Sequence, residues 1–129
     1  TTYVPDSSYL STRSSCRTRA FPALDPDGRE NLAPGIARRL ADLVGRPIAV
    51  RDFLHYALAV LATPAYRARF DDELRMDYPR IPWPTDARAF DAVERAGTDL
   101  VASLTSRQND TEAIASCVAK LDPLIVDLL

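Results

Sequence analysis

The middle of the chain, residues 52–84, has the sequence DFLHYALAVLATPAYRARFDDELRMDYPRIPWP. Its first part carries apolar residues at helical spacing, which predicts a helix from about Val50 to Ala62. We expect this helix to bury one stripe of side chains, made of Phe53, Leu54, Ala57, Val60 and Leu61.

Thr63-Pro64 predicts a break followed by a new helix, because threonine is a common N-cap and proline fits the first helical turn. Tyr66, Phe70 and Leu74 then recur at every fourth position. This spacing predicts a third helix that ends near Met76.

The segment that follows is rich in proline and reads Tyr78-Pro79-Arg80-Ile81-Pro82-Trp83-Pro84. Proline lacks an amide hydrogen and disfavours helix at the residue before it, so these residues fit neither a helix nor a central strand. They predict an extended, polyproline-like segment, here called the proline strap. Trp83 within it either packs over the helices or stacks on a nucleic-acid base.

Further helices are predicted on both sides. Pro34 and Gly45 delimit a first helix whose apolar face is Ile36, Leu40, Leu43 and Val44. Thr85 is expected to cap a long fourth helix with an apolar face of Phe90, Val93, Gly97, Leu100, Val101 and Leu104. A polar gap at residues 106–110 precedes a fifth helix with Ile114, Cys117, Val118 and Leu121, and Asp122-Pro123 predicts the start of a sixth.

Residues 1–31 show no helical period and are rich in Ser, Thr, Pro, Asp and Gly. Tyr3-Val4, Tyr9-Leu10 and residues 17–24 are candidate strands, and residues 25–28 (Asp-Pro-Asp-Gly) predict a turn. The expected fold is therefore mainly α: a compact bundle of about five helices over residues 32–129, with an extended or β segment at 1–31 and the proline strap. This is one domain, which we expect to be a fragment of a larger protein.

Composition excludes several classes of protein. The 129 residues are 47% hydrophobic and 26% charged, as in ordinary globular domains, and no apolar run is long enough to cross a membrane. Two distant cysteines, Cys16 and Cys117, do not form a disulfide framework, and we expect them to be reduced. Without a recognisable leader peptide, the expected location is the cytoplasm.

Arginine is unevenly distributed. The net charge is −2, yet residues 11–51 hold 8 Arg against 4 acidic residues, and 15 of the 16 basic residues are Arg. Arginine suits phosphate and base-edge contacts, but a GC-rich genome produces the same bias. Both explanations remain open on composition alone.

A catalytic site is not apparent. The four glycines form neither a P-loop nor a GxGxxG turn, and a single histidine with two cysteines does not predict a zinc site. His55 is either a base or DNA contact, or a partly buried residue that satisfies a neighbour. The acidic run Asp71-Asp72-Glu73 is either a hard-cation site or a solvated helix end.

The middle segment resembles the C-terminal specificity region of Type ISP restriction–modification enzymes and related adenine-specific DNA methyltransferases. The resemblance rests on residues 52–61 (DFLHYALAVL), on Thr63-Pro64 with Tyr66-Arg67, and on residues 77–82 (DYPRIP). Phe21-Pro22 and Asn31-Leu32 extend it upstream. Two positions depart from the pattern: Ala23-Leu24-Asp25 replaces an aromatic-rich strand, and Ala62 replaces a polar residue.

The resemblance implies a target recognition domain, beside an adenine-N6 methyltransferase domain of the same polypeptide that binds S-adenosylmethionine, in defence against foreign DNA. This chain itself would hold no cofactor, no metal and no catalytic residue. The implied partner is double-stranded DNA. The candidate contacts are Arg13, Arg17, Arg19, Arg29, Asn31, Arg67 and Arg69, and the motif residues with an expected structural role are Thr63, Pro64, Tyr66, Tyr78, Pro79, Arg80, Ile81 and Pro82.

Two alternatives stay open. The chain is a structural helical scaffold that packs on the methyltransferase domain without touching DNA, or it is a small interaction protein of its own. A scaffold would show an exposed apolar face and no coherent basic surface.

Overall fold

The computed structural model describes residues 3–5, 20–77, 79–106 and 110–129. Its described part is mainly helical, as predicted, with six helices and one small pair of strands. The helices are α1 (Pro34–Val44), α2 (Val50–Ala62), α3 (Pro64–Arg69), α4 (Asp71–Met76), α5 (Ala87–Thr105) and α6 (Thr111–Val126). Strands β1 (Tyr3–Pro5) and β2 (Ala20–Pro22) pair antiparallel, with Val4 opposite Phe21.

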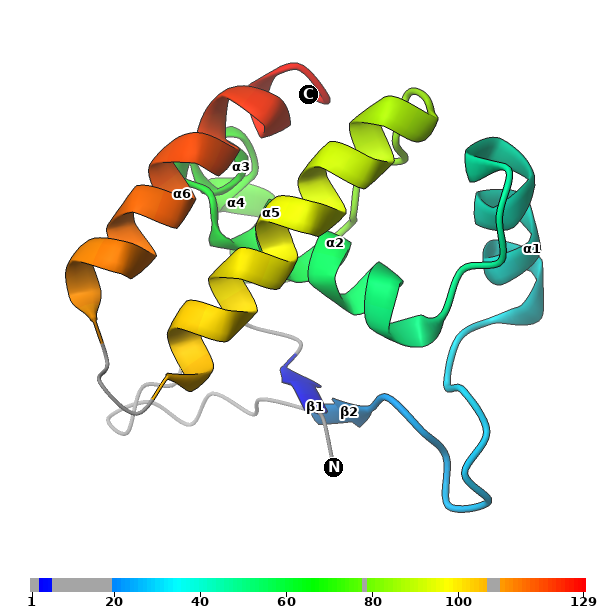
Figure 1. Cartoon of the computed structure of the whole chain (residues 1–129). Helices are drawn as coiled ribbons and strands as arrows, with labels where there is room; N and C mark the ends of the chain where they lie inside the picture. Colours follow the sequence, from blue (N-terminus) through cyan, green and yellow to red (C-terminus); the bar gives the residue numbers. More distant parts are fainter. Residues whose placement is uncertain (1–2, 6–19, 78, 107–109) are drawn as a thin grey trace.

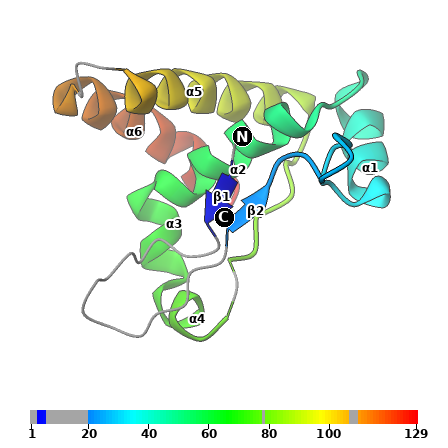
Figure 2. The same cartoon turned by 90° about the horizontal axis from the view of Figure 1, so that it is seen from below.

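The helices pack around α2 and α5. Figures 1 and 2 show α5 and α6 side by side, with α2 crossing beneath α5, α3 next to α6, and α1 at the opposite end from α6. The pairs α2–α5 and α5–α6 make the most extensive contacts. Residues that are far apart in sequence therefore form one core.

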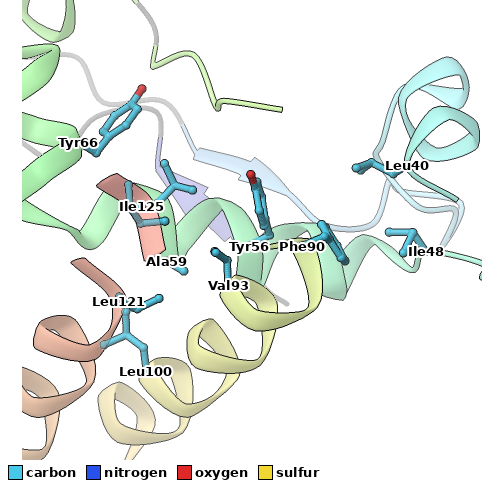
Figure 3. Packing of buried hydrophobic residues seen from close by; sticks show 11 residues of the cluster. Leu40, Ile48, Tyr56, Ala59, Tyr66, Phe90, Val93, Leu100, Leu121 and Ile125 are labelled. Atoms are coloured by element: carbon cyan, nitrogen blue, oxygen red, sulfur yellow. The ribbon is translucent and has the colours of Figure 1, made fainter. Parts of the chain in front are cut away.

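That core draws on α1, α2, α3, α5 and α6 (Figure 3). Three helices supply most of the side chains that are 1% exposed or less. They are Tyr56, Ala59 and Val60 of α2, Phe90, Val93 and Leu100 of α5, and Leu121 and Ile125 of α6. The predicted stripe of α2 is partly wrong, because Phe53, Leu54 and Leu61 are only half-buried while Tyr56 and Ala59 are fully buried. Since α2 touches α3, α5 and α6, its buried surface is wider than a single stripe.

Helices α2 and α5 approach closely at Gly97. A Cβ atom added there would meet the backbone carbonyl of His55, with 2.8 Å to its carbon, and Ala59 Cβ at 3.2 Å. Only glycine fits this position, because the carbonyl belongs to rigid helical backbone and cannot move aside.

Three predicted boundaries are wrong. The helix expected from Pro64 to Met76 breaks at Phe70 into α3 and α4. Thr63 precedes α3 but does not cap it: the hydroxyl turns back and donates to the Val60 carbonyl at 2.8 Å. Asp86, not Thr85, caps α5 by accepting from the Ala89 amide at 2.7 Å.

The prediction that a separate helix starts at Asp122-Pro123 is also wrong, because α6 continues through Pro123 to Val126. An internal proline leaves a single helical carbonyl, that of Ala119, without its amide partner. Ala119 is exposed, so water can solvate that carbonyl. Burial of Leu121 and Ile125, each 0% exposed, offsets the loss.

The N-terminal expectations are borne out only in part. Tyr3-Val4 and residues 20–22 are strands, Leu24 forms an isolated bridge with Glu30, and the turn at residues 25–28 is present. The candidate strand Tyr9-Leu10, Cys16 and residues 17–19 lie outside the described residues. Residues 79–84 are neither helix nor strand, as predicted.

Candidate functional site

Two buried tyrosines hold the proline strap against the helices. The hydroxyl of Tyr56 on α2 donates to the Pro82 carbonyl, and that of Tyr66 on α3 donates to the Arg80 carbonyl, both at 2.8 Å. Figure 3 shows the two hydroxyls pointing to the same side. The strap thus presents the carbonyls of Arg80 and Pro82 to two different helices.

Both tyrosines are 1% exposed, and Tyr56 stacks on Phe90 with ring centroids 5.1 Å apart. Burial raises the pKa of the Tyr56 phenol and also that of Tyr66, since the phenolate form is poorly solvated there. The phenols therefore stay neutral and remain donors to the strap.

Trp83 lies on the outer side of the strap. Its side chain is 41% exposed, and the guanidinium carbon of Arg39 on α1 lies 5.2 Å from the ring centroid. The next residue, Pro84, is buried. The indole thus has one face covered by an arginine and is not buried as a lid.

The hairpin at residues 23–31 is an ordered turn that presents Arg29 and Asn31. The Asn31 amide donates to the Ala23 carbonyl at 2.9 Å, and the Asp25 amide donates to the Arg29 carbonyl at 2.8 Å. Asp25 Oδ1 also accepts from the amides of Asp27 and Arg29. Gly28 has φ +80°, which glycine adopts without strain.

The hairpin is attached to α2 by a side chain. Glu30 Oε1 accepts from the Val50 amide at 3.1 Å, which satisfies one of the free amides at the start of α2. Arg46 then joins Asp52 of α2 at 3.2 Å to Asp91 of α5 at 3.0 Å. Arg46 therefore bridges α2 and α5, and its hydrogen bond to Asp91 raises the pKa of its guanidinium.

Arg67 and Arg69 lie on α3, and both are exposed. Arg67 Nε donates to the Leu61 carbonyl at 3.3 Å, and the Arg69 guanidinium lies 5.6 Å from the Phe70 ring centroid. The helix is capped from a distance: Asp122 of α6 accepts from the Ala65 amide at 2.9 Å. Asp122 therefore orients the helix that carries both arginines.

The candidate contacts do not form one cluster in the described structure. Arg29 and Asn31 lie on the hairpin, whereas Arg67 and Arg69 lie on α3, and Arg13, Arg17 and Arg19 lie outside the described residues. Of the motif residues, Tyr66, Arg80 and Pro82 anchor the strap, while Pro79 and Ile81 are half-buried within it. Tyr78 lies outside the described residues, and Pro64 starts α3 after the fully buried Thr63.

His55 is partly buried and contacts polar neighbours, and the acidic run lies at an exposed helix start. His55 Nδ1 lies 2.8 Å from Thr98 Oγ1 and 3.5 Å from Glu94 Oε1, with 15% of its side chain exposed. Asp71, Asp72 and Glu73 are exposed at the start of α4, and Asp71 pairs with Arg75 at 2.9 Å. Among the described residues, no three His, Cys, Asp or Glu side chains are grouped to hold a metal ion.

Arg39 and Asp122 are not among the residues that the sequence pattern predicted to matter. Arg39 has no motif of its own, and Asp122 had been placed at a helix start. Neither the contact of Arg39 with Trp83 nor the capping of α3 by Asp122 has a local signal, because each joins residues more than 40 positions apart.

None of the described helices has the length and apolar character that a bilayer-spanning helix needs.

The strap and the Thr63-Pro64 break are both part of the motif that points to a known family. The Type ISP C-terminal specificity domain matches residues 1–118. The chain belongs to this family. Its members serve target recognition in restriction–modification, and the resemblance predicted from residues 52–82 is confirmed.

No curated protein and no solved structure matches the chain. The family match ends at Val118, but Leu121, Asp122 and Ile125 of the same helix complete the core and cap α3.

Proposed function

We propose that this Type ISP specificity domain binds double-stranded DNA directly and holds it for an adenine-N6 methyltransferase domain of the same polypeptide. The methyltransferase domain would bind S-adenosylmethionine and flip the adenine, a step for which duplex DNA must be held in register. The domain described here would supply contacts and no catalytic residue. The family membership is the observation that carries the proposal.

The charge distribution supports it. Six basic side chains of the described residues are exposed and make no ion pair with an acidic side chain: Arg38, Arg39, Arg51, Arg88, Arg95 and Lys120. Arg29 is only weakly paired, 3.9 Å from Asp27, with 79% of its side chain exposed. Such arginines remain available to neutralise phosphates in spite of the net charge of −2.

The ordered hairpin supports a contact role for Arg29 and Asn31. Backbone amides of the hairpin are hydrogen-bonded within the turn, and Glu30 attaches the hairpin to α2. The conformation of the hairpin is therefore already formed before DNA would bind. A pre-formed loop loses less conformational entropy on binding than a flexible one. Loops held on a helical scaffold are common places for recognition residues.

The scaffold alternative receives less support from the surface. The large exposed apolar side chains of the described residues are spread over separate segments and do not line one helix: Leu24, Ile36, Met76, Trp83, Leu104, Val126 and Leu129. Docking faces are usually contiguous.

The experiment is a titration of mixed-sequence duplex DNA with the whole chain at several salt concentrations. We expect the logarithm of the affinity to fall linearly with the logarithm of salt. The double variants Arg17→Ala/Arg19→Ala and Arg67→Ala/Arg69→Ala, and Arg29→Ala, should bind more weakly with a shallower slope, by about one unit for each phosphate that is no longer neutralised. Affinity that is unchanged by salt and by all three variants would overturn the proposal and favour the scaffold.

A further inference from the structure

Arg39 and Arg69 are the two arginines of the described structure that lie over an aromatic ring and make no ion pair, and only for Arg39 does the ring come from a separate segment, the proline strap. The Arg39 guanidinium lies over the Trp83 ring, 5.2 Å from the centroid, and no salt bridge joins it to Asp42, the only acidic residue of α1. Within the described residues the Arg39 guanidinium makes no hydrogen bond or ion pair, so its N–H groups are not used by the protein. Arg39 therefore combines a restrained position with unused hydrogen-bond donors.

The support beneath Arg39 is itself rigid. Trp83 lies between Pro82 and Pro84, whose rings restrict the backbone on both sides. The Pro82 carbonyl accepts from Tyr56, and Pro84 is buried. The indole is thus held by a strap that two buried tyrosines attach to the core.

Other arginines are held by groups that compete for the same donors. Arg46 bridges Asp52 and Asp91, Arg75 pairs with Asp71, and Arg80 lies 3.7 Å from Asp77. A phosphate approaching these side chains must displace or share a carboxylate. At Arg39 an aromatic ring takes the place of the carboxylate, so the positive charge is not neutralised.

We propose that Arg39, stacked on Trp83, is a pre-organised contact to a DNA backbone phosphate, with Trp83 as its positioning residue. The inference rests on the proposed DNA binding and adds a site that the family motif does not include. Planar donors suit phosphate oxygens, and a side chain that is already ordered loses less entropy on binding. Trp83 supports the arginine and does not stack on a base through the face that Arg39 covers.

The test compares four variants of the whole chain by titration with mixed-sequence duplex DNA over a range of salt. Arg39→Ala should weaken binding roughly tenfold and reduce the salt slope by about one unit, as removal of one charged hydrogen-bonding group does. Arg39→Lys keeps the charge and loses the planar stack, so it should keep the slope and bind with intermediate affinity. Trp83→Leu should also weaken DNA binding but keep the salt slope, because the Arg39 charge remains while the ring that positions it is lost.

The matched control is Arg75→Ala, which removes the same charge from an exposed position on α4 where Asp71 already pairs with the guanidinium. Equal affinities and slopes for Arg39→Ala and Arg75→Ala would overturn the inference and leave the proposed function intact. Arg39→Lys binding like the native chain would also overturn it, since charge alone would then suffice. If the native chain binds no duplex DNA, the proposed function itself fails. Thermal unfolding of each variant identifies losses that come from unfolding, and Arg39→Lys keeps the test valid if Trp83→Leu does not fold.

Discussion

Tyr56 on α2 donates a hydrogen bond of 2.8 Å to the carbonyl oxygen of Pro82, and so joins the centre of the core to the proline strap. Tyr66 makes the equivalent bond to Arg80 from α3. The strap is part of the motif that resembles the family, and these bonds fix its position on the helices.

Tyr56→Phe and Tyr66→Phe should each destabilise the chain by about 1–2 kcal/mol, because each leaves a strap carbonyl without its donor. The double variant should also loosen the strap. Trp83 is the only tryptophan, so its fluorescence reports on the strap directly, while urea denaturation followed by circular dichroism reports on the helices. If the single variants are as stable as the native chain, the two bonds contribute nothing to the fold.

Stability should fall as the pH rises above about 10, the ordinary pKa of a tyrosine phenol. Burial raises the pKa of Tyr56 and Tyr66 in the folded state, so above this pH the unfolded chain loses protons that the folded chain retains. The contribution is complete below pH 10 and declines above it. Denaturation from neutral pH upward measures the decline, and Tyr56→Phe should make it less steep. An equal decline in the variant would show that other groups cause it.

Gly97→Ala should destabilise the chain by about 1–3 kcal/mol, because the added methyl group meets the His55 carbonyl of the crossing helix. Gly35→Ala is the matched control. No atom lies within 4 Å of a Cβ at Gly35, and alanine favours helix there, so we expect a neutral or slightly stabilising effect. Thermal unfolding compares the two. A tolerated Gly97→Ala would contradict the close packing of α2 on α5.

Asp122→Ala should cost about 1–2 kcal/mol, as loss of a helix cap does, and should weaken DNA binding if Arg67 and Arg69 are contacts. Asp127→Ala, an exposed position near the end of the chain, is the control for charge. Truncation after Val118 removes Leu121 and Ile125 from the core and should abolish cooperative unfolding. A truncated chain that still unfolds cooperatively would show that the family match alone delimits the domain.

The α3 face can be tested by a gain of binding. Asp72 and Glu73 are exposed directly after Arg67 and Arg69, and their charges repel an approaching phosphate. Asp72→Asn/Glu73→Gln should therefore raise the affinity for duplex DNA several-fold at low salt. The control Glu112→Gln/Asp127→Asn makes the same charge change on and just after α6. Equal gains in both pairs would show a general charge effect and remove α3 from the candidate surface.

Much of the fold could be predicted because its signals are local. Pro34 and Gly45 delimit α1, apolar spacing predicts α5, and the prolines of residues 79–84 exclude regular structure. The boundaries that failed have different causes. At Thr63 and Asp86 a local hydrogen bond replaces the expected cap, whereas α6 continues through Pro123 because Leu121 and Ile125 are buried on its far side.

The sequence alone determined that the chain is mainly helical, that a proline strap follows the helical residues 64–76, and that the chain resembles the Type ISP specificity domain. These follow from backbone restrictions and short-range motifs, which neighbouring residues carry. Only the tertiary structure decided that Tyr56 and Tyr66 hold the strap, that Asp122 caps α3, and that Arg39 lies on Trp83. Each joins residues that are distant in sequence, and such contacts depend on how the helices pack.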